Sequence, residues 1–100
     1  MFKAIILLGR REGSTPEEFR AWWLGPHAEL AAGLPGLRRL RFNVVDEGGG
    51  YDGVSELWFD SREAFDAAYA SEHGQRVAAD SLANVGRRER LLVDEHVVLG

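Results

Sequence analysis

The chain has 100 residues, a length that predicts a single domain over residues 1–100. Its formal net charge of −4 argues against nucleic-acid binding, which needs a basic face. The absence of cysteine excludes disulfides, thiol nucleophiles and thiolate metal ligands, and it fits a cytoplasmic location. The apolar run at residues 4–8 is too short to cross a membrane, so we expect no membrane partner.

The first half of the chain predicts a strand followed by a long helix. Residues 2–9 are apolar at nearly every position, which is typical of a strand buried on both faces. Thr15 and Glu18 have the spacing of a capping box, so a helix should begin there. Because proline disrupts a helix interior, we expect a kink or restart near Gly25-Pro26, and residues 33–36 should end the helix.

The middle of the chain predicts a pair of strands and a second helix. Residues 37–45 alternate between apolar and polar side chains, as a half-buried strand does. The glycine-rich loop at 46–50 leads to a third strand at 54–59. Asp60 should then cap the second helix, with Glu63 as its capping-box partner.

The last part predicts a third short helix over residues 75–85, with Gly86 just beyond its end, and a final strand over residues 91–99. The residues expected to point inward from this helix are Ala78, Leu82 and Val85.

The resulting order is β-α-β-β-α-β, with an extra helical turn before the last strand. It predicts an α+β, ferredoxin-like fold, in which a four-stranded antiparallel sheet carries helices on one face. The first and last strands are apolar on both faces, so something else must cover the open face. A second copy of the chain would do so, and we expect a homodimer.

His27 is the best candidate for chemistry, since histidine titrates near neutral pH. It lies at the edge of the apolar stripe of the first helix, just after the expected kink. A single histidine at such an edge is, however, more often a boundary residue than a catalyst. The stripe itself consists of Phe19, Trp22, Trp23, Pro26 and Leu30.

Several runs of the sequence, taken in chain order, resemble the EthD domain of the dimeric α+β barrel superfamily. The resemblance covers essentially the whole chain. The resemblance implies subunits that pack sheet against sheet, each with a pocket between its own sheet and helices. Relatives include muconolactone isomerases, aromatic polyketide cyclases and cofactor-free quinone-forming monooxygenases, and the name-giving member accompanies an oxidative ether-degrading system. The matching runs are Phe19…Trp23…His27…Leu30, residues 35–38, residues 51–59 and residues 95–99.

The resemblance also implies site residues. His27 matches the histidine that cyclase-like and isomerase-like relatives use as an acid, a base or a hydrogen-bonding group, and Trp23 matches the aromatic residue one turn earlier. Tyr51 and Asp52 match an aromatic-acid pair before the third strand. Asp80 matches an acidic position in the third helix, although its place on the helical wheel favours exposure to solvent.

We therefore expect His27 to move a proton α to a carbonyl, while Tyr51 or Asp52 fixes the substrate oxygen or the histidine tautomer. Asp52 precedes a glycine and is equally typical of a turn. A pocket lined by aromatic side chains would suit a planar aromatic or polyketide-like substrate. The expected substrate-binding residues are Phe19, Trp22, Trp23, Trp58, Tyr69 and Asp80.

Glu56 is a second candidate acid, because a carboxyl group on an apolar strand face tends to have a raised pKa. The favoured alternative is a cross-strand ion pair with Arg39 or Arg41. The basic clusters at residues 38–41 and 87–90 are expected to be strand-edge charges or anchors for an anionic group.

These observations leave open more than one function. The first is a cofactor-independent cyclase, isomerase or lyase centred on His27. The second is an EthD-type oxidoreductase or an accessory protein of an oxidative degradation system, and the third is a non-catalytic ligand-binding dimer. The three histidines lack metal-ligand spacing and residues 48–50 do not form a dinucleotide fingerprint, so we expect no metal and no cofactor.

Overall fold

The computed structural model describes all residues, 1–100. Along the chain, the elements are β1 (Phe2–Arg10), α1 (Pro16–Trp22), the π-helical segment η1 (Trp23–His27), α2 (Ala28–Ala32), β2 (Arg39–Val44), β3 (Gly53–Phe59), α3 (Arg62–Ala70), α4 (Glu72–Asn84) and β4 (Val85–Asp94).

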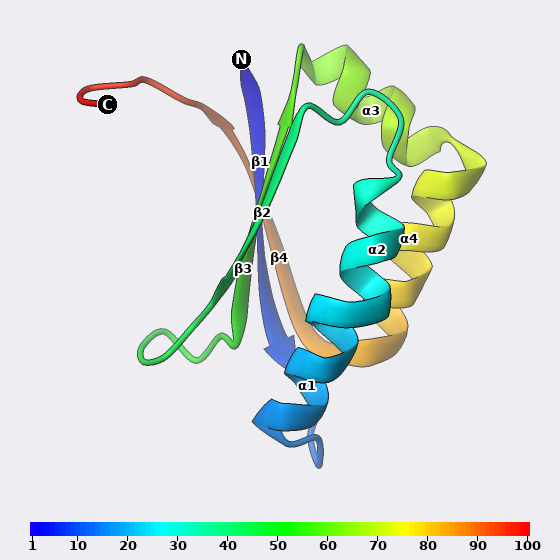
Figure 1. Cartoon of the computed structure of the whole chain (residues 1–100), viewed down its shortest axis with the longest axis vertical. Helices are drawn as coiled ribbons and strands as arrows, with labels where there is room; N and C mark the ends of the chain where they lie inside the picture. The colour runs from blue at the N-terminus through cyan, green and yellow to red at the C-terminus, as the bar shows by residue number, and fades with distance from the viewer.

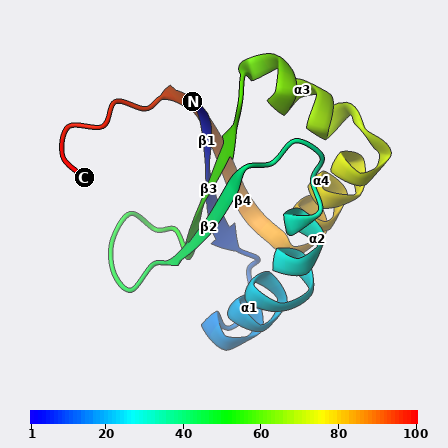
Figure 2. The same ribbon diagram turned by 45° about the horizontal axis from the view of Figure 1, so that its top comes forward.

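The strands form one antiparallel four-stranded sheet in the order β2-β3-β1-β4. All helices lie on the same side of this sheet (Figure 1), and a second view confirms that α1–α2 and α3–α4 form one layer (Figure 2). The predicted ferredoxin-like α+β fold is therefore confirmed. β1 and β3 occupy the centre of the sheet, which explains why β1 is apolar at nearly every position.

The long first helix begins and kinks where the sequence predicts. Thr15 accepts from the backbone N–H of Glu18, and the Glu18 carboxylate accepts from the backbone N–H of Thr15, which completes the capping box. Gly25 then leaves helical geometry, with φ −100° and ψ −107°, next to Pro26. The kink turns the chain so that His27 points inward and is buried.

Two helix boundaries differ from the sequence prediction. Ser61, and not Asp60, caps α3 by accepting from the backbone N–H of Ala64, whereas Asp60 pairs with Arg38. α4 begins at Glu72, three residues earlier than the predicted start at 75, because Ser71 caps it through the N–H of Gly74. Gly74 lies inside this first turn, where an added Cβ would overlap the backbone of Ala68 and Tyr69.

The last strand also differs, since β4 covers Val85–Asp94 and not residues 91–99. Gly86 does not end α4 in a left-handed turn, because α4 passes directly into an extended Val85. The buried face of α4 also differs from the predicted one. Val77 and Ser81 are buried, whereas Leu82, predicted to point inward, is 65% exposed.

The core lies between the helices and the sheet, and alternation along the strands decides which side chains enter it. β1 contributes Ala4, Ile6 and Leu8, and β3 contributes Leu57 and Phe59. The helices add Phe19, Trp23, Ala31, Phe65, Ala68 and Val77.

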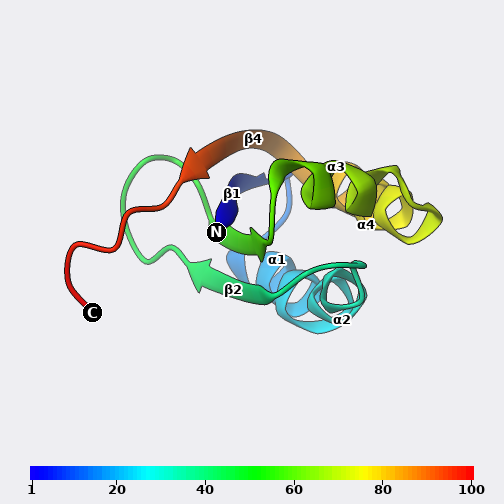
Figure 3. The same ribbon diagram turned by 90° about the horizontal axis from the view of Figure 1, so that it is seen from above.

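The opposite face of the sheet carries no helix, as the view from above makes clear (Figure 3). The strand registers place a set of apolar side chains there, around a buried Trp58. This set consists of Ile5, Leu7, Val54, Leu91 and Val93. None of the helices has the length and apolar character required to cross a membrane.

Candidate active site

His27 projects from the kinked segment η1 into the layer between helices and sheet, where it is only 5% exposed. Its ring lies against Trp22, with centroids 4.7 Å apart, and faces Phe42 of β2 at 6.2 Å. The capped start of α1 and the kink at Gly25 together set this position. The imidazole is therefore held by aromatic packing and does not lie in bulk water.

Asp80 of α4 is the direct partner of His27. Its Oδ2 lies 2.8 Å from Nδ1 of His27 and also accepts from the indole Nε1–H of Trp22 at 3.1 Å. Its Oδ1 accepts from the side-chain amide of Asn84 at 3.3 Å. Because a carboxylate can only accept, Nδ1 carries the hydrogen and Nε2 is left as the free nitrogen.

This partnership corrects the exposure that the helical wheel predicted for Asp80. The side chain is 31% exposed, and its carboxylate turns toward η1. The reason lies in the tertiary structure: α4 packs beside the kinked helix and so brings Asp80, at the margin of α4, next to the buried N–H group of His27. Asn84 was not predicted, and its place one helical turn from Asp80 is the signal that could have identified it.

A small cavity lies beside His27, with a volume of about 20 Å³. This volume holds about one water molecule. Several of its walls are polar, and they come from η1, α3, α4, β3 and β4. The lining residues are Ile6, Leu8, His27, Ser55, Tyr69, Val77, Ala78, Ser81 and Arg88.

Tyr69 and Arg88 determine the electrostatics of this cavity. Burial raises the pKa of the Tyr69 phenol, and the positive charge of Arg88 opposes that effect in part. Burial lowers the pKa of the Arg88 guanidinium, and the charge of Arg90 lowers it further. The Nε atom of Arg88 is buried without a hydrogen-bond partner.

Sequence reasoning missed Ser55, Ser81 and Arg88 as site residues. The basic cluster at 87–90 was recognised, but the predicted strand began after it. Alternation back from Leu92, which packs against the core, places Arg88 on the helix-facing side, and a register shift beside Arg10 lets Val85 face the core as well.

Of the five aromatic residues expected to bind substrate, only Tyr69 borders the cavity beside His27. Phe19 and Trp23 belong to the core, where Trp23 stacks on Phe42 with centroids 4.4 Å apart and the rings nearly parallel at 4°. Trp22 holds Asp80 instead of lining the cavity. Tyr69 alone lines it. The space beneath Trp23 is thus filled with side chains, whereas Phe19 and Trp22 border a separate, more open hollow of about 370 Å³ between the start of α1 and Asn84.

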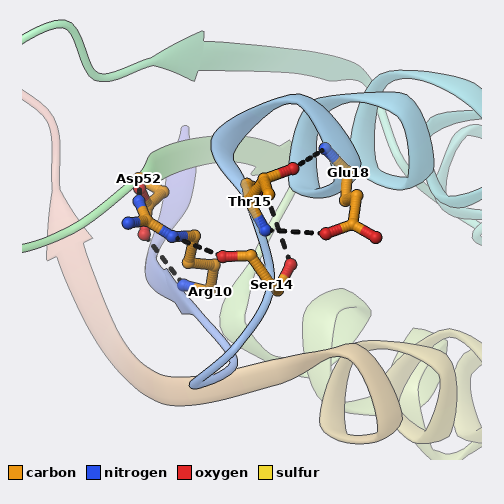
Figure 4. Close-up of polar contacts among 5 residues, drawn as sticks. All are labelled: Arg10, Ser14, Thr15, Glu18 and Asp52. Carbon is orange, nitrogen blue, oxygen red and sulfur yellow. Dashed lines mark hydrogen bonds and ion pairs between the residues drawn. The ribbon is translucent and has the colours of Figure 1, made fainter.

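Tyr51 and Asp52 are not next to His27 and do not fix its tautomer. Asp52 accepts from the side chain of Arg10 at 2.7 Å and from its backbone N–H at 2.8 Å, beside the capping box of α1 (Figure 4). Tyr51 lies under the guanidinium of Arg87, 4.3 Å from its ring centroid. The pair therefore ties the loop before β3 to the neighbouring ends of β1 and β4.

Glu56 and Trp58 lie on the opposite face of the sheet from His27, because their strand positions alternate with those of Ser55 and Leu57. Glu56 pairs with Lys3 at 2.6 Å, so its pKa is lowered and not raised. The expected partners Arg39 and Arg41 lie instead over the ring of Trp58. Neither Glu56 nor Trp58 can reach the cavity.

The site offers an imidazole whose Nδ1 is bonded to Asp80 and whose ring borders a partly polar cavity. Such an arrangement is suited to accepting and returning a proton. No cluster of three or more His, Cys, Asp or Glu side chains has the geometry of a metal site.

Comparison with solved structures gives the same fold. An EthD (ethyl tert-butyl ether D) family protein from Bacillus halodurans is 21% identical, with a TM-score of 0.87, over 96% of this chain and 99% of its own. A mutant of SnoaB, a cofactor-independent oxygenase from Streptomyces nogalater, is 18% identical, with a TM-score of 0.75, over 98% and 95% of the two chains. A dimeric ferredoxin-like protein of unknown function from Thermobifida fusca is 18% identical, with a TM-score of 0.75, over 92% and 88%.

At these identities, the similar structures establish the fold and leave the reaction open. No curated protein matches the sequence. The sequence profile of the EthD domain matches residues 11–85, which include His27 and Asp80 as well as α1 to α4. The chain belongs to the EthD domain family.

Proposed function

We propose that the chain is a small enzyme in which His27 transfers a proton to or from a small organic molecule, as cyclases, isomerases and lyases do. The pairing of buried His27 with Asp80, beside a partly polar cavity, is the observation that carries this proposal. A histidine held by a carboxylate at one nitrogen presents a free base at the other.

In the proposed step, Nε2 of His27 removes a proton from a carbon next to a carbonyl group. Asp80 keeps the hydrogen on Nδ1 and stabilises the imidazolium that forms, and Trp22 and Phe42 hold the ring in place. Tyr69 lines the cavity, and in the proposed step its hydroxyl donates to the developing oxyanion. It takes the role that the sequence assigned to Tyr51.

An aromatic or polyketide-like substrate is larger than the cavity, so binding requires the helices to separate. α4 and the kinked helix are joined at this point through Asp80, which contacts both Trp22 and His27. We propose that the substrate enters between these helices and that their closure excludes water from the reacting atoms.

Hydrogen–deuterium exchange tests the proton transfer without knowledge of the final product. A panel of aromatic ketones and β-dicarbonyl compounds is incubated with the protein in D₂O, and loss of the α-proton signal is followed by NMR. We expect at least one compound to exchange about 10²–10⁴ times faster than in buffer. His27→Gln should abolish the effect, while His96→Gln, which changes an exposed histidine, should not.

Two outcomes would select another function. If oxygen is consumed in proportion to turnover, the chain is an oxidoreductase, like the cofactor-independent oxygenase SnoaB, which has a similar fold. If compounds bind but none exchanges, and His27→Gln changes neither result, the chain is a ligand-binding protein and His27 has a structural role.

We also propose that the protein acts as a homodimer that packs through the open face of the sheet. The apolar centre of that face supports this arrangement, and similar structures from Thermobifida fusca and Bacteroides fragilis are described as dimeric. Sedimentation should give twice the chain mass. Ile5→Lys, at the centre of the face, should give monomers, whereas Leu82→Lys, on the exposed side of α4, should not. A monomeric wild type would refute the dimer.

A further inference from the structure

Arg88 is the cation that the strand register brings to the cavity beside His27. It is opposite Leu8 in the β1–β4 pairing, so it shares the helix-facing side of the sheet, and it lines the cavity together with His27. Arg87 and Glu89, its neighbours in sequence, point to the other face.

The guanidinium of Arg88 has no acidic partner, in contrast to many arginines of this chain. Its Nε is buried without a hydrogen bond, and no ion pair joins it to any carboxylate. The charged or polar groups that influence its pKa are Tyr69 and Arg90, and neither is an acid that is ionised at neutral pH. The arginines that do have a carboxylate partner are Arg10, Arg38, Arg62, Arg76 and Arg87.

An unpaired, partly buried cation is unfavourable, because its lost hydration is not replaced. The carboxylate of Asp80 does not compensate, since it is not among the groups that influence the pKa of Arg88, and its oxygens accept from His27, Trp22 and Asn84. The cavity therefore has one wall with surplus positive charge and unused N–H donors. A carboxylate that reaches this wall as the helices separate would supply the missing hydrogen bonds.

We propose that Arg88 binds the carboxylate of the substrate and so selects an organic acid for His27 to act on. This inference rests on the proposed proton-transfer function. A guanidinium recognises a carboxylate through paired N–H···O bonds in one plane, and thus orients the molecule as well as attracting it. Tyr69, which also lines the cavity and influences the pKa of Arg88, would add a hydroxyl donor.

Binding of benzoate, with benzamide as its neutral counterpart, tests the proposal apart from turnover. The probes are titrated into ¹⁵N-labelled protein, and the Arg88 Nε–H and His27 ring signals are followed by NMR. We expect benzoate to bind at least about tenfold more tightly than benzamide, since hydrogen bonds to a charged group are lost in the amide. Equal binding of the two probes, or no binding of benzoate, would overturn the proposal.

Variants locate the effect. Arg88→Gln should weaken benzoate binding by about tenfold or more and leave benzamide unchanged, and Arg88→Lys should recover part of the loss. Arg87→Gln, on the opposite face of the same strand, serves as the matched control and should bind as the wild type does. Wild-type benzoate affinity in Arg88→Gln would refute the role of Arg88.

The two proposals fail separately. His27→Gln should retain the preference for benzoate, because the carboxylate contacts Arg88 and not the imidazole. If that preference is present while no compound exchanges its α-proton, the anion site stands and the proposed reaction falls. If exchange depends on His27 while Arg88→Gln has no effect on binding, the reaction stands and the anion site falls.

Discussion

Removal of the Asp80 carboxylate should destabilise the protein and release His27. In Asp80→Ala, the N–H groups of His27 and Trp22 lose their acceptor. Both residues are partly or fully enclosed, so water replaces the carboxylate poorly. Since Nδ1 of His27 is no longer held, we also expect the hydrogen of the neutral ring to redistribute between its nitrogens.

The size of the effect follows from the exposure of the pair. A hydrogen bond to a charged group is worth about 1.5–3 kcal/mol, and the lower part of that range applies because Asp80 is 31% exposed. Loss of both bonds should therefore lower the free energy of unfolding by about 2–4 kcal/mol. For a domain of this length, that corresponds to a fall in Tm of roughly 10–25 °C.

Thermal unfolding followed by circular dichroism measures the stability, at one fixed protein concentration because a dimer would make Tm concentration-dependent. Long-range ¹H–¹⁵N spectra report which nitrogen of His27 carries the hydrogen. Asp80→Asn serves as the control: it keeps an oxygen acceptor and the side-chain size, so it should recover part of the loss. A Tm within about 2 °C of the wild type for Asp80→Ala, with unchanged His27 signals, would refute the reasoning.

Two further predictions concern the scaffold. Gly74→Ala should lower the free energy of unfolding by about 1–3 kcal/mol, since the new Cβ would overlap the carbonyl oxygen of Ala68. As a control, Ala79→Gly on the exposed side of α4 should cost about 1 kcal/mol through helix propensity alone. If urea unfolding finds Gly74→Ala as stable as the wild type, the close approach of α3 and α4 is contradicted. The second prediction concerns acid stability, because Lys3 lowers the pKa of Glu56 below the ordinary 4.5. The pair therefore stabilises the fold above that pH, and its contribution of about 1 kcal/mol disappears as pH falls through the depressed pKa. In Lys3→Met, the free energy of unfolding should fall less steeply between about pH 5 and pH 3. If its pH dependence is unchanged, the Lys3–Glu56 pair is not the cause of the acid destabilisation.

The site illustrates how an edge-strand residue can escape sequence analysis. Arg88 lies in a cluster that was expected to hold charges at a strand edge or to anchor an anion, but the strand was predicted to begin after it. A glycine after the helix suggested a terminating turn at Gly86, whereas α4 continues without a turn into β4. Arg88 was left out of the predicted site because the start of the last strand was placed too late, and not because the role of the basic cluster was misjudged.

Local interactions made several features predictable from sequence. The capping box of Thr15 and Glu18, the kink at Gly25, and the alternation of β2 depend on residues within a few positions of one another, and the structure contains all of them. Buried β1, with apolar side chains on both faces, was recognisable for the same reason. These elements in their order specify the ferredoxin-like fold.

The partners of the candidate site depended on tertiary structure. His27 and Asp80 are 53 positions apart, and only the packing of α4 against η1 joins them, whereas Asp52 is held by Arg10 on the neighbouring strand. Glu56 faces away because a strand alternates its sides, and the sequence does not reveal which side the helices cover. Residue types and local spacing thus determined the secondary-structure elements and identified His27 as the candidate residue. Contacts between distant segments decided which side chains His27 touches, because those contacts depend on how the helices pack on the sheet.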